Sequence, residues 1–298
     1  MKKKYRHHLV LGAITASLFC GMLAGISCSR KPQNDNTKGI HIFVSIPPQK
    51  DFIRRIGGDK VNVEILIKPG VDPHTFEPTV KQIVRLGRAK VYFQIDMPFE
   101  NHLLEKIHSM FPQMKIVNTA RGIKRRTMGG AIDHHHEGTD PHIWLDPMLV
   151  KIQGANICEA LKKVDPSNAD YYETNLRTFE ADLDKLNADI AAKLAPVKGR
   201  TFFVFHPAFG YFADAYGLHQ QGVEVDGKSP TIKQLEKLIR DAGEHDAKVI
   251  FAEPQFSISM AKTVAKQIGA RVETLDPLSE DYFANMRRIA EKIYTALK

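Results

Sequence analysis

A long apolar stripe in the middle of the chain constrains the fold more than any other feature. Its members are spaced four, three, four, three, four and four residues apart: Tyr172, Leu176, Phe179, Leu183, Leu186, Ile190 and Leu194. This spacing places all seven side chains on one face of an α-helix. Pro166 opens the segment and Pro196 closes it, with Gly199 just beyond. We therefore predict one linking helix over residues 166–196, on the order of 45 Å long at about 1.5 Å per residue.

A stripe of this kind also suits the seam of a coiled-coil dimer. We prefer a single helix that runs along two domains as a stiff backbone, in a protein that is a monomer. The chain has 298 residues, which is too long for one small core and fits two domains of ordinary size. Its hydrophobic fraction of 43% is that of a globular protein and not of a disordered one.

The segments on either side of this helix alternate between strand-like and helix-like patterns. Before it, the strand candidates are Ile40–Ile46, Val61–Ile67, Lys90–Ile95 and Lys115–Val117, and the helix candidates are Gln49–Ile56, Val80–Gly87 and Phe99–Met110. After it, the strand candidates are Thr201–Phe205, Val223–Val225, Ala247–Ala252 and Ala270–Leu275, and the helix candidates are Ile232–Ala242, Ser259–Gly269 and Tyr282–Leu297. Strands that alternate with helices predict parallel sheets. The predicted fold is therefore α/β, with two similar lobes over residues 40–165 and 197–298 that are joined by the linking helix.

The first residues have the composition of an export signal. Met1–His8 is rich in Lys and Arg, and Leu9–Ser27 is apolar and carries no charge. We predict that residues 1–27 are a signal peptide, and an uncleaved transmembrane anchor is the alternative. Both interpretations place the rest of the chain outside the cytoplasm, because the basic end stays inside.

The next residues predict attachment to a membrane through a lipid. Gly25-Ile26-Ser27-Cys28 resembles a loose lipobox, the cleavage and lipidation site of bacterial lipoproteins, although the usual Leu three residues before the cysteine is absent. We expect Cys28 to be lipidated and the polar residues 28–39 to form a flexible tether. The net charge of +8 falls to about +4 without residues 1–27, because those residues hold four of the 42 Lys and Arg and none of the 34 Asp and Glu. A charge of this size gives no support to nucleic-acid binding.

Four potential metal ligands stand where loops are expected. Asp-Pro-His occurs twice, ending at His74 and His142, while His206 and Asp276 each follow an apolar run of the second lobe and precede a proline. Ligands of parallel α/β domains bind beyond the carboxyl ends of the strands, so we predict that the four residues meet in the cleft between the lobes. Three imidazoles and one carboxylate suit Zn²⁺, with bonds of about 2.0–2.2 Å in tetrahedral geometry. Copper or nickel would compete on affinity, and more carboxylate would favour manganese.

Other polar residues near these motifs have weaker signals. A tract of three histidines stands in a polar stretch with glycines on both sides: His134, His135 and His136. Such a tract is typical of a low-affinity metal collector, or of a solvated loop with chance histidines. Glu77, Asp146 and Glu253 are candidates to accept hydrogen bonds from imidazole N–H groups, or else to cap a helix or turn.

Five motifs in order resemble the metal-binding solute-binding proteins of ABC importers, the TroA/ZnuA-like family. They are Asp72–Pro78, Asp140–Pro147, Phe205–Phe209, Phe251–Gln255 and Leu275–Leu278, and the resemblance covers roughly Ile40 to the C-terminus. It implies two α/β lobes joined by a long rigid helix, with the metal in the cleft. The ligand positions of the family fall on His74, His142, His206 and Asp276. Manganese-binding members tend to carry Glu at the position of His206, so the resemblance implies zinc and makes Mn²⁺ the lesser candidate.

The predicted function is capture of Zn²⁺ outside the cytoplasm and its delivery to the permease of an ABC importer, which works with its own ATPase. We do not predict an enzyme. One alternative is a zinc-dependent hydrolase with Glu253 as the general base, but no His-Glu-x-x-His helix or other hydrolytic signature occurs. A second alternative is a manganese-binding protein or a surface adhesin on the same scaffold. Zinc affinity is expected to fall as the pH drops through the histidine range.

Overall fold

The structure is a computed structural model that describes residues 39–128, 138–224 and 231–298. The stretch Thr37–Lys298 forms one compact unit. Among the residues that are described, no helix combines the length and the apolar character that a membrane span requires.

Four of the sequence predictions fall outside the described residues. They concern the signal peptide over residues 1–27, the lipidation of Cys28, the tether over residues 28–39, of which only residue 39 is described, and the metal-collecting tract of His134, His135 and His136. The structure does not test them, and they stay predictions.

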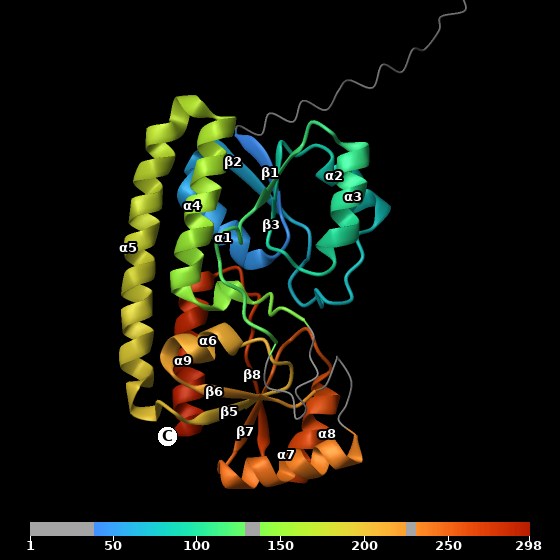
Figure 1. The fold of residues 1–298 in the computed structure, drawn as a ribbon, viewed down its shortest axis with the longest axis vertical. Helices are drawn as coiled ribbons and strands as arrows, with labels where there is room; N and C mark the ends of the chain where they lie inside the picture. Colours follow the sequence, from blue (N-terminus) through green and yellow to red (C-terminus); the bar gives the residue numbers. More distant parts are fainter. Residues whose placement is uncertain (1–38, 129–137, 225–230) are drawn as a thin grey trace, which may run out of the picture. The chain divides into compact units, whose positions relative to one another are not determined.

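The first lobe is built on a four-stranded parallel sheet (Figure 1). Its strands are β1 (Ile40–Val44), β2 (Val61–Ile65), β3 (Val91–Gln94) and β4 (Lys115–Asn118), and its helices are α1 (Pro47–Gly57), α2 (Val80–Leu86) and α3 (Glu100–Met110). The strand order is β2-β1-β3-β4. The chain adds β2 on one side of β1 and then crosses over to add β3 and β4 on its other side. The central strands β1 and β3 are buried over Ile42–Val44 and Val91–Phe93, which explains the apolar runs at these positions.

The second lobe repeats this topology with a second parallel sheet of order β6-β5-β7-β8. Its strands are β5 (Thr201–Val204), β6 (His219–Gly222), β7 (Val249–Ala252) and β8 (Arg271–Thr274), and its helices are α6 (Gly210–Tyr216), α7 (Ile232–Glu244), α8 (Ile258–Ile268) and α9 (Tyr282–Leu297). The predicted fold class, two α/β lobes with parallel sheets, is confirmed.

The linking helix is α5 (Ala169–Leu194), which follows α4 (Pro147–Val164) and a 3-10 turn at Pro166–Asn168. All seven residues of the predicted stripe are buried. They face other parts of the same chain, because α5 packs against α4, against α1 of the first lobe and against α9 (Figure 1). The stripe therefore does not form the seam of a coiled-coil dimer. Its 26 residues correspond to roughly 39 Å at about 1.5 Å per residue.

One strand prediction is wrong. The predicted strand Val223–Val225 is a loop at Val223 and Glu224, and the strand of this region is the polar segment β6 instead. An edge strand pairs on one side only, and among the described strands β6 pairs with β5 alone, so it can form without a run of apolar residues. The apolar signal of Val223 comes from a buried loop position, where its backbone N–H donates to the carbonyl of Val204 at 2.9 Å.

Candidate metal centre

Three histidines from three different loops converge in the structure. His74 lies between β2 and α2, His142 directly precedes a 3-10 turn before α4, and His206 follows β5. A ligand-capable nitrogen of each ring lies within 4.8 Å of those of the other two. Nitrogens around a tetrahedral zinc ion with bonds of about 2.0–2.1 Å are about 3.4 Å apart, so inward shifts of less than about 1 Å bring all three onto one ion.

Buried carboxylates hold two of these rings. The Nδ1 atom of His142 lies 2.8 Å from Oδ1 of Asp140, and Nδ1 of His206 lies 2.7 Å from Oε1 of Glu224. An ionised carboxylate can only accept, so each Nδ1 carries the proton and each Nε2 keeps its lone pair for a metal. The Nε2 atom of His206 is buried and has no hydrogen-bond partner among the described residues. A buried nitrogen with a lone pair and no hydrogen donor beside it is suited to bind a metal ion.

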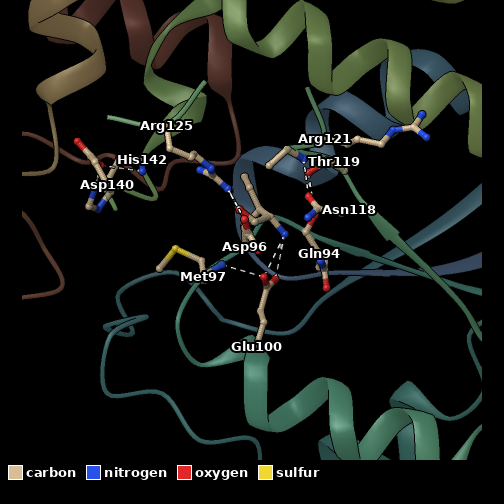
Figure 2. A network of polar contacts seen from close by, with 12 residues as sticks. Gln94, Asp96, Met97, Glu100, Asn118, Thr119, Arg121, Arg125, Asp140 and His142 are labelled. Carbon is tan, nitrogen blue, oxygen red and sulfur yellow. Dashed lines mark hydrogen bonds and ion pairs between the residues drawn. The ribbon is translucent and has the colours of Figure 1, made fainter. Parts of the chain in front are cut away.

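The aspartates of the two identical Asp-Pro-His tripeptides contact different groups. Asp140 accepts both the backbone N–H of His142, at 3.0 Å, and the ring N–H (Figure 2). Asp72 accepts the backbone N–H of His74 at 2.9 Å and the hydroxyl of Thr75 at 3.1 Å. The carboxylate of Asp72 therefore fixes a turn, whereas that of Asp140 orients an imidazole.

Arg126 stands behind Asp140 and reaches the second lobe. Its Nη1 atom donates to Oδ2 of Asp140 at 2.9 Å, and its Nε atom lies 2.9 Å from Oδ2 of Asp214 on α6. The guanidinium passes so close to Gly210 that a Cβ there would lie 1.4 Å from Nη1. The hydroxyl of Tyr211 accepts the backbone N–H of Arg126 at 3.1 Å and donates to the carbonyl of Asp140 at 3.2 Å. The orientation of a first-lobe ligand thus depends on a helix of the second lobe.

A network of polar contacts joins the loop after β3 to Arg125, the residue before Arg126. Glu100, buried at the start of α3, accepts the backbone N–H groups of Ile95 at 3.1 Å and Met97 at 2.8 Å (Figure 2). Burial raises the pKa of this carboxyl group. Asp96, in the same loop, accepts a 2.9 Å bond from Arg125. The loop after β3 is therefore tied to the residue next to Arg126.

The surroundings of the three rings are apolar. Phe256 stacks on His206 at 4.8 Å between ring centroids, and Trp144 lies 5.2 Å from His142. The cavity between the rings, closed by residues of both lobes, has a volume of about 10 Å³, which is enough for one ion. Burial, followed by the charge of His206, lowers the pKa of His74 to about 4. Burial also lowers the pKa of His142 and of His206, so all three imidazoles are neutral at pH 7.

Burial alone would raise the pKa of Asp140. The hydrogen bonds from His142 and Arg126 outweigh that effect and lower it, so this carboxylate stays charged behind the imidazole.

The predicted fourth ligand, Asp276, does not join this group of mutually close ligand atoms. Its Oδ1 accepts the side-chain amide of Gln255 at 3.0 Å and the backbone N–H of Leu278 at 2.9 Å. Gln255 and Leu278 both line the cavity, so Asp276 is hydrogen-bonded to two of its lining residues. Its role as fourth ligand stays a prediction.

This geometry does not test the predicted secondary tract. The group of close ligand atoms holds His74, His142 and His206 and was sought among the described residues alone. The three residues of the tract stand in a part of the chain that the structure leaves undescribed: His134, His135 and His136.

Among the other sequence candidates, Asp146 is the N-cap of α4, where it accepts the backbone N–H of Met148 at 2.8 Å. Glu253 accepts the backbone N–H of His206 at 3.3 Å and does not touch the ring. The acceptors of the imidazole N–H groups are Asp140 and Glu224 instead. Asp140 could have been found from its place two residues before His142. Glu224 lies 18 residues from its partner, and no local pattern points to it.

Two α/β lobes on one linking helix, with a small cavity between them that is lined by three neutral imidazoles, define a cleft-type binding protein for a transition-metal cation.

A family model described as "Zinc-uptake complex component A periplasmic" matches residues 42–296, and the chain belongs to this family. It is 34% identical over 275 residues to the high-affinity zinc uptake system protein ZnuA of Bacillus subtilis (strain 168), with 82% of this chain and 83% of that protein covered. A crystal structure of ZnuA is 41% identical, covers 88% of this chain and 100% of its own, and has a TM-score of 0.82. The laminin-binding protein Lmb of Streptococcus agalactiae, described as bifunctional with adhesin and metal transporting activity, is 27% identical, covers 87% and 100% of the two chains, and has a TM-score of 0.76. The predicted family resemblance is confirmed.

Proposed function

We propose that this protein captures Zn²⁺ outside the cytoplasm and delivers it to the permease of an ABC importer. The observation that carries the proposal is the triangle formed by His74, His142 and His206, in which burial keeps the rings neutral and carboxylates hold two of them in one tautomer. Neutral imidazole nitrogen is a preferred zinc ligand. The relatives named for zinc uptake support this choice of cargo.

Nitrogen ligands also separate zinc from manganese. Imidazole suits zinc, whereas carboxylate and carbonyl oxygen suit manganese. We propose that His206 is the residue on which this choice rests, with Asp276 as the fourth ligand. One directly bound carboxylate leaves the site about +1, and the charges of Asp140 and Glu224 behind the rings offset that excess.

The placement of the ligands gives a route for release. His74 and His142 precede the linking helix, and His206 with its partner Glu224 follows it. Moving the two lobes apart therefore divides the ligand set, and an ion held by one half alone is bound more weakly. We propose that the permease causes this separation, acting on lobes bounded at 40–165 and 197–298.

The proposal also covers the attachment of the protein to the membrane and the role of the His tract. Cys28 is the lipid anchor to a bacterial membrane, residues 28–39 are the tether, and the protein acts as a monomer. The tract of His134, His135 and His136 collects zinc weakly. The description of the family as periplasmic supports a location outside the cytoplasm.

The hydrolase alternative requires a base beside the metal. Burial raises the pKa of Glu253 well above its usual range, and its Oε2 atom accepts a backbone N–H of His206. A buried carboxyl group with a raised pKa, whose oxygen already accepts a backbone N–H, is poorly placed to take a proton from a metal-bound water. The adhesin alternative has the dual description of Lmb in its favour. It predicts that binding of a host ligand survives the loss of the histidines.

Competition titration of purified protein from residue 29 onward tests the proposal. We expect one tight zinc site, weaker binding by the His tract, and tighter binding of zinc than of manganese. Replacement of His74, His142 or His206 by Ala is expected to weaken the tight site by more than about 100-fold, because each removes a direct ligand. His108→Ala, an exposed histidine of α3, is the matched control and leaves the site unchanged. A tight site that survives both His74→Ala and His142→Ala would refute the assignment.

A further inference from the structure

Helices α2 and α7, one in each lobe, begin with nearly the same sequence. The first is Thr79-Val80-Lys81-Gln82 and the second is Thr231-Ile232-Lys233-Gln234. In both, the threonine side chain accepts the backbone N–H of the glutamine, and the glutamine side chain accepts the backbone N–H of the threonine. The latter bonds measure 3.0 Å in α2 and 2.8 Å in α7. The two capping boxes fix the same local backbone at both places.

The two helices are also equivalent in the fold. Each follows the loop after its lobe's edge strand, β2 or β6, and leads into a strand next to the lobe's central strand, β3 or β7 (Figure 1). The loop before α2 carries His74 and the loop that follows β6 carries Glu224. In the sequence, both helices therefore follow a segment that supplies a residue of the metal centre, His74 six residues before Val80 and Glu224 eight residues before Ile232.

The pattern of exposure is the same along both segments. From the threonine to the following leucine, Thr79 to Leu86 and Thr231 to Leu238, every position falls in the same class of burial. The residue after each threonine is large, β-branched and left in water: Val80 is 82% exposed and Ile232 is 81% exposed. These are the two highest values among the exposed large apolar residues of the described chain.

These side chains contribute little to the stability of the protein alone. Burying such a side chain is worth about 1.5–3 kcal/mol, and neither segment uses that gain. The lysine next to each one, Lys81 and Lys233, forms no ion pair with the residues described. Val84, one turn after Val80, is 56% exposed and widens the apolar surface on α2. An exposed apolar group beside a free cation, present twice, has the chemistry of a contact surface.

We propose that Val80–Lys81 and Ile232–Lys233 are a two-point docking surface for the membrane permease of the importer. Two equal patches fit a partner that offers the same socket twice, and a partner of two like subunits does so by symmetry. The chemistry of the patch defines each socket as an apolar pocket bordered by a carboxylate that meets the lysine. The identity of the partner rests on the proposed function.

This arrangement joins docking to release of the ion. Each socket of the partner binds a different lobe of this protein. The helix that it contacts follows the loop of His74 in one lobe and the loop of Glu224 in the other. A change in the distance between the two sockets therefore acts on the distance between the two halves of the metal centre. A docking surface confined to one lobe could not do this.

Zinc uptake by cells tests the surface. The full chain with Val80→Ser and Ile232→Ser replaces the native copy, and uptake of radioactive zinc is measured at limiting zinc. We expect uptake to fall at least tenfold while zinc affinity of the purified protein stays within twofold of the unchanged protein. Met110→Ser with Met148→Ser, which removes two exposed methionines of α3 and α4, is the matched control and leaves uptake unchanged. Normal uptake by the Val80 and Ile232 double variant would overturn the proposal.

Crosslinking in intact cells separates this inference from the proposed function. A photoreactive amino acid is placed at position 80, 232 or 110, and the crosslinked protein is identified by mass spectrometry. Positions 80 and 232 are expected to capture the same multi-spanning membrane protein, or two related subunits of one complex, and position 110 to capture neither. Two unrelated proteins, or no membrane protein, would contradict the docking surface. If the unchanged protein binds zinc but supports no uptake, the proposed function is wrong. The crosslinking result then still shows whether positions 80 and 232 contact a membrane protein.

Discussion

The repeated Asp-Pro-His motif allows one substitution to be made twice with different expected results. Asp140→Asn removes the charge that lies 2.8 Å from the ring of His142, at a residue that is 0% exposed. Asp72→Asn removes a charge that contacts the backbone N–H of His74 and the hydroxyl of Thr75. An asparagine oxygen can still accept the backbone bond in both turns, so both variants are expected to fold.

The structure sets the size of the difference. Loss of a partner that orients a metal-binding imidazole costs about 10- to 100-fold in affinity, or about 1.4–2.7 kcal/mol. We expect Asp140→Asn to lie near the upper end, because no water reaches its carboxylate and Arg126 is left facing an amide. We expect Asp72→Asn to change zinc affinity by less than about threefold, or about 0.6 kcal/mol, since its carboxylate does not touch an imidazole.

Competition titration with a zinc chelator at pH 7 measures both variants, and thermal unfolding of the metal-free proteins checks that each is folded. Equal losses of affinity in the two variants would mean that the contact between Asp140 and the His142 ring does not matter. An unchanged affinity in Asp140→Asn would refute the argument from carboxylate orientation altogether.

Three further predictions follow from the packing and the charges. Because the pKa of His74 is about 4, zinc affinity measured by titration is expected to stay level from pH 7 to about 5 and to fall below that, rather than near 6.5. The metal-free protein is expected to lose stability over a different range, as the pH falls from about 6.5 to about 4, because the unfolded chain takes up the proton on His74 first. The loss from this histidine is up to about 1.4 kcal/mol per pH unit, and a urea titration that shows no loss between pH 6.5 and 4 would contradict this. Gly210→Ala places a Cβ 1.4 Å from Nη1 of Arg126 and is expected to weaken zinc binding about tenfold, because it displaces the guanidinium from Asp140. Added to Arg126→Ala, it is expected to cause no further loss of zinc affinity. Additive losses would show that the two residues act separately. Leu183→Ala removes a fully buried side chain of α5 and is expected to lower the free energy of unfolding by about 2–5 kcal/mol with little change in zinc affinity, whereas a loss below about 1 kcal/mol would show that α5 is not a packed backbone.

The pattern of the sequence was enough for most of the secondary structure and the division into two α/β blocks. The seven-residue stripe predicted α5 because helical spacing is a local property and every member turned out to be buried. The pattern was not enough at β6, where an edge strand pairs on one side only and needs no apolar signal. Helix α4 was not predicted, although its buried residues recur at helical spacing, because small or polar residues such as Gln153, Gly154 and Ala160 take up part of the buried face and weaken the apolar signal.

For the metal centre, too, local sequence patterns predicted some features and the tertiary structure decided the others. Local spacing alone pointed to His74, His142 and His206, because each stands at a loop mouth next to a proline. The sequence by itself determined which side chains are available to bind a metal. Only the tertiary structure decided that Glu224 holds His206, that Arg126 passes Gly210 to reach Asp140, and that the two identical tripeptides differ in role. Those contacts join residues far apart in the chain, and their strength depends on burial, which no short stretch of sequence specifies.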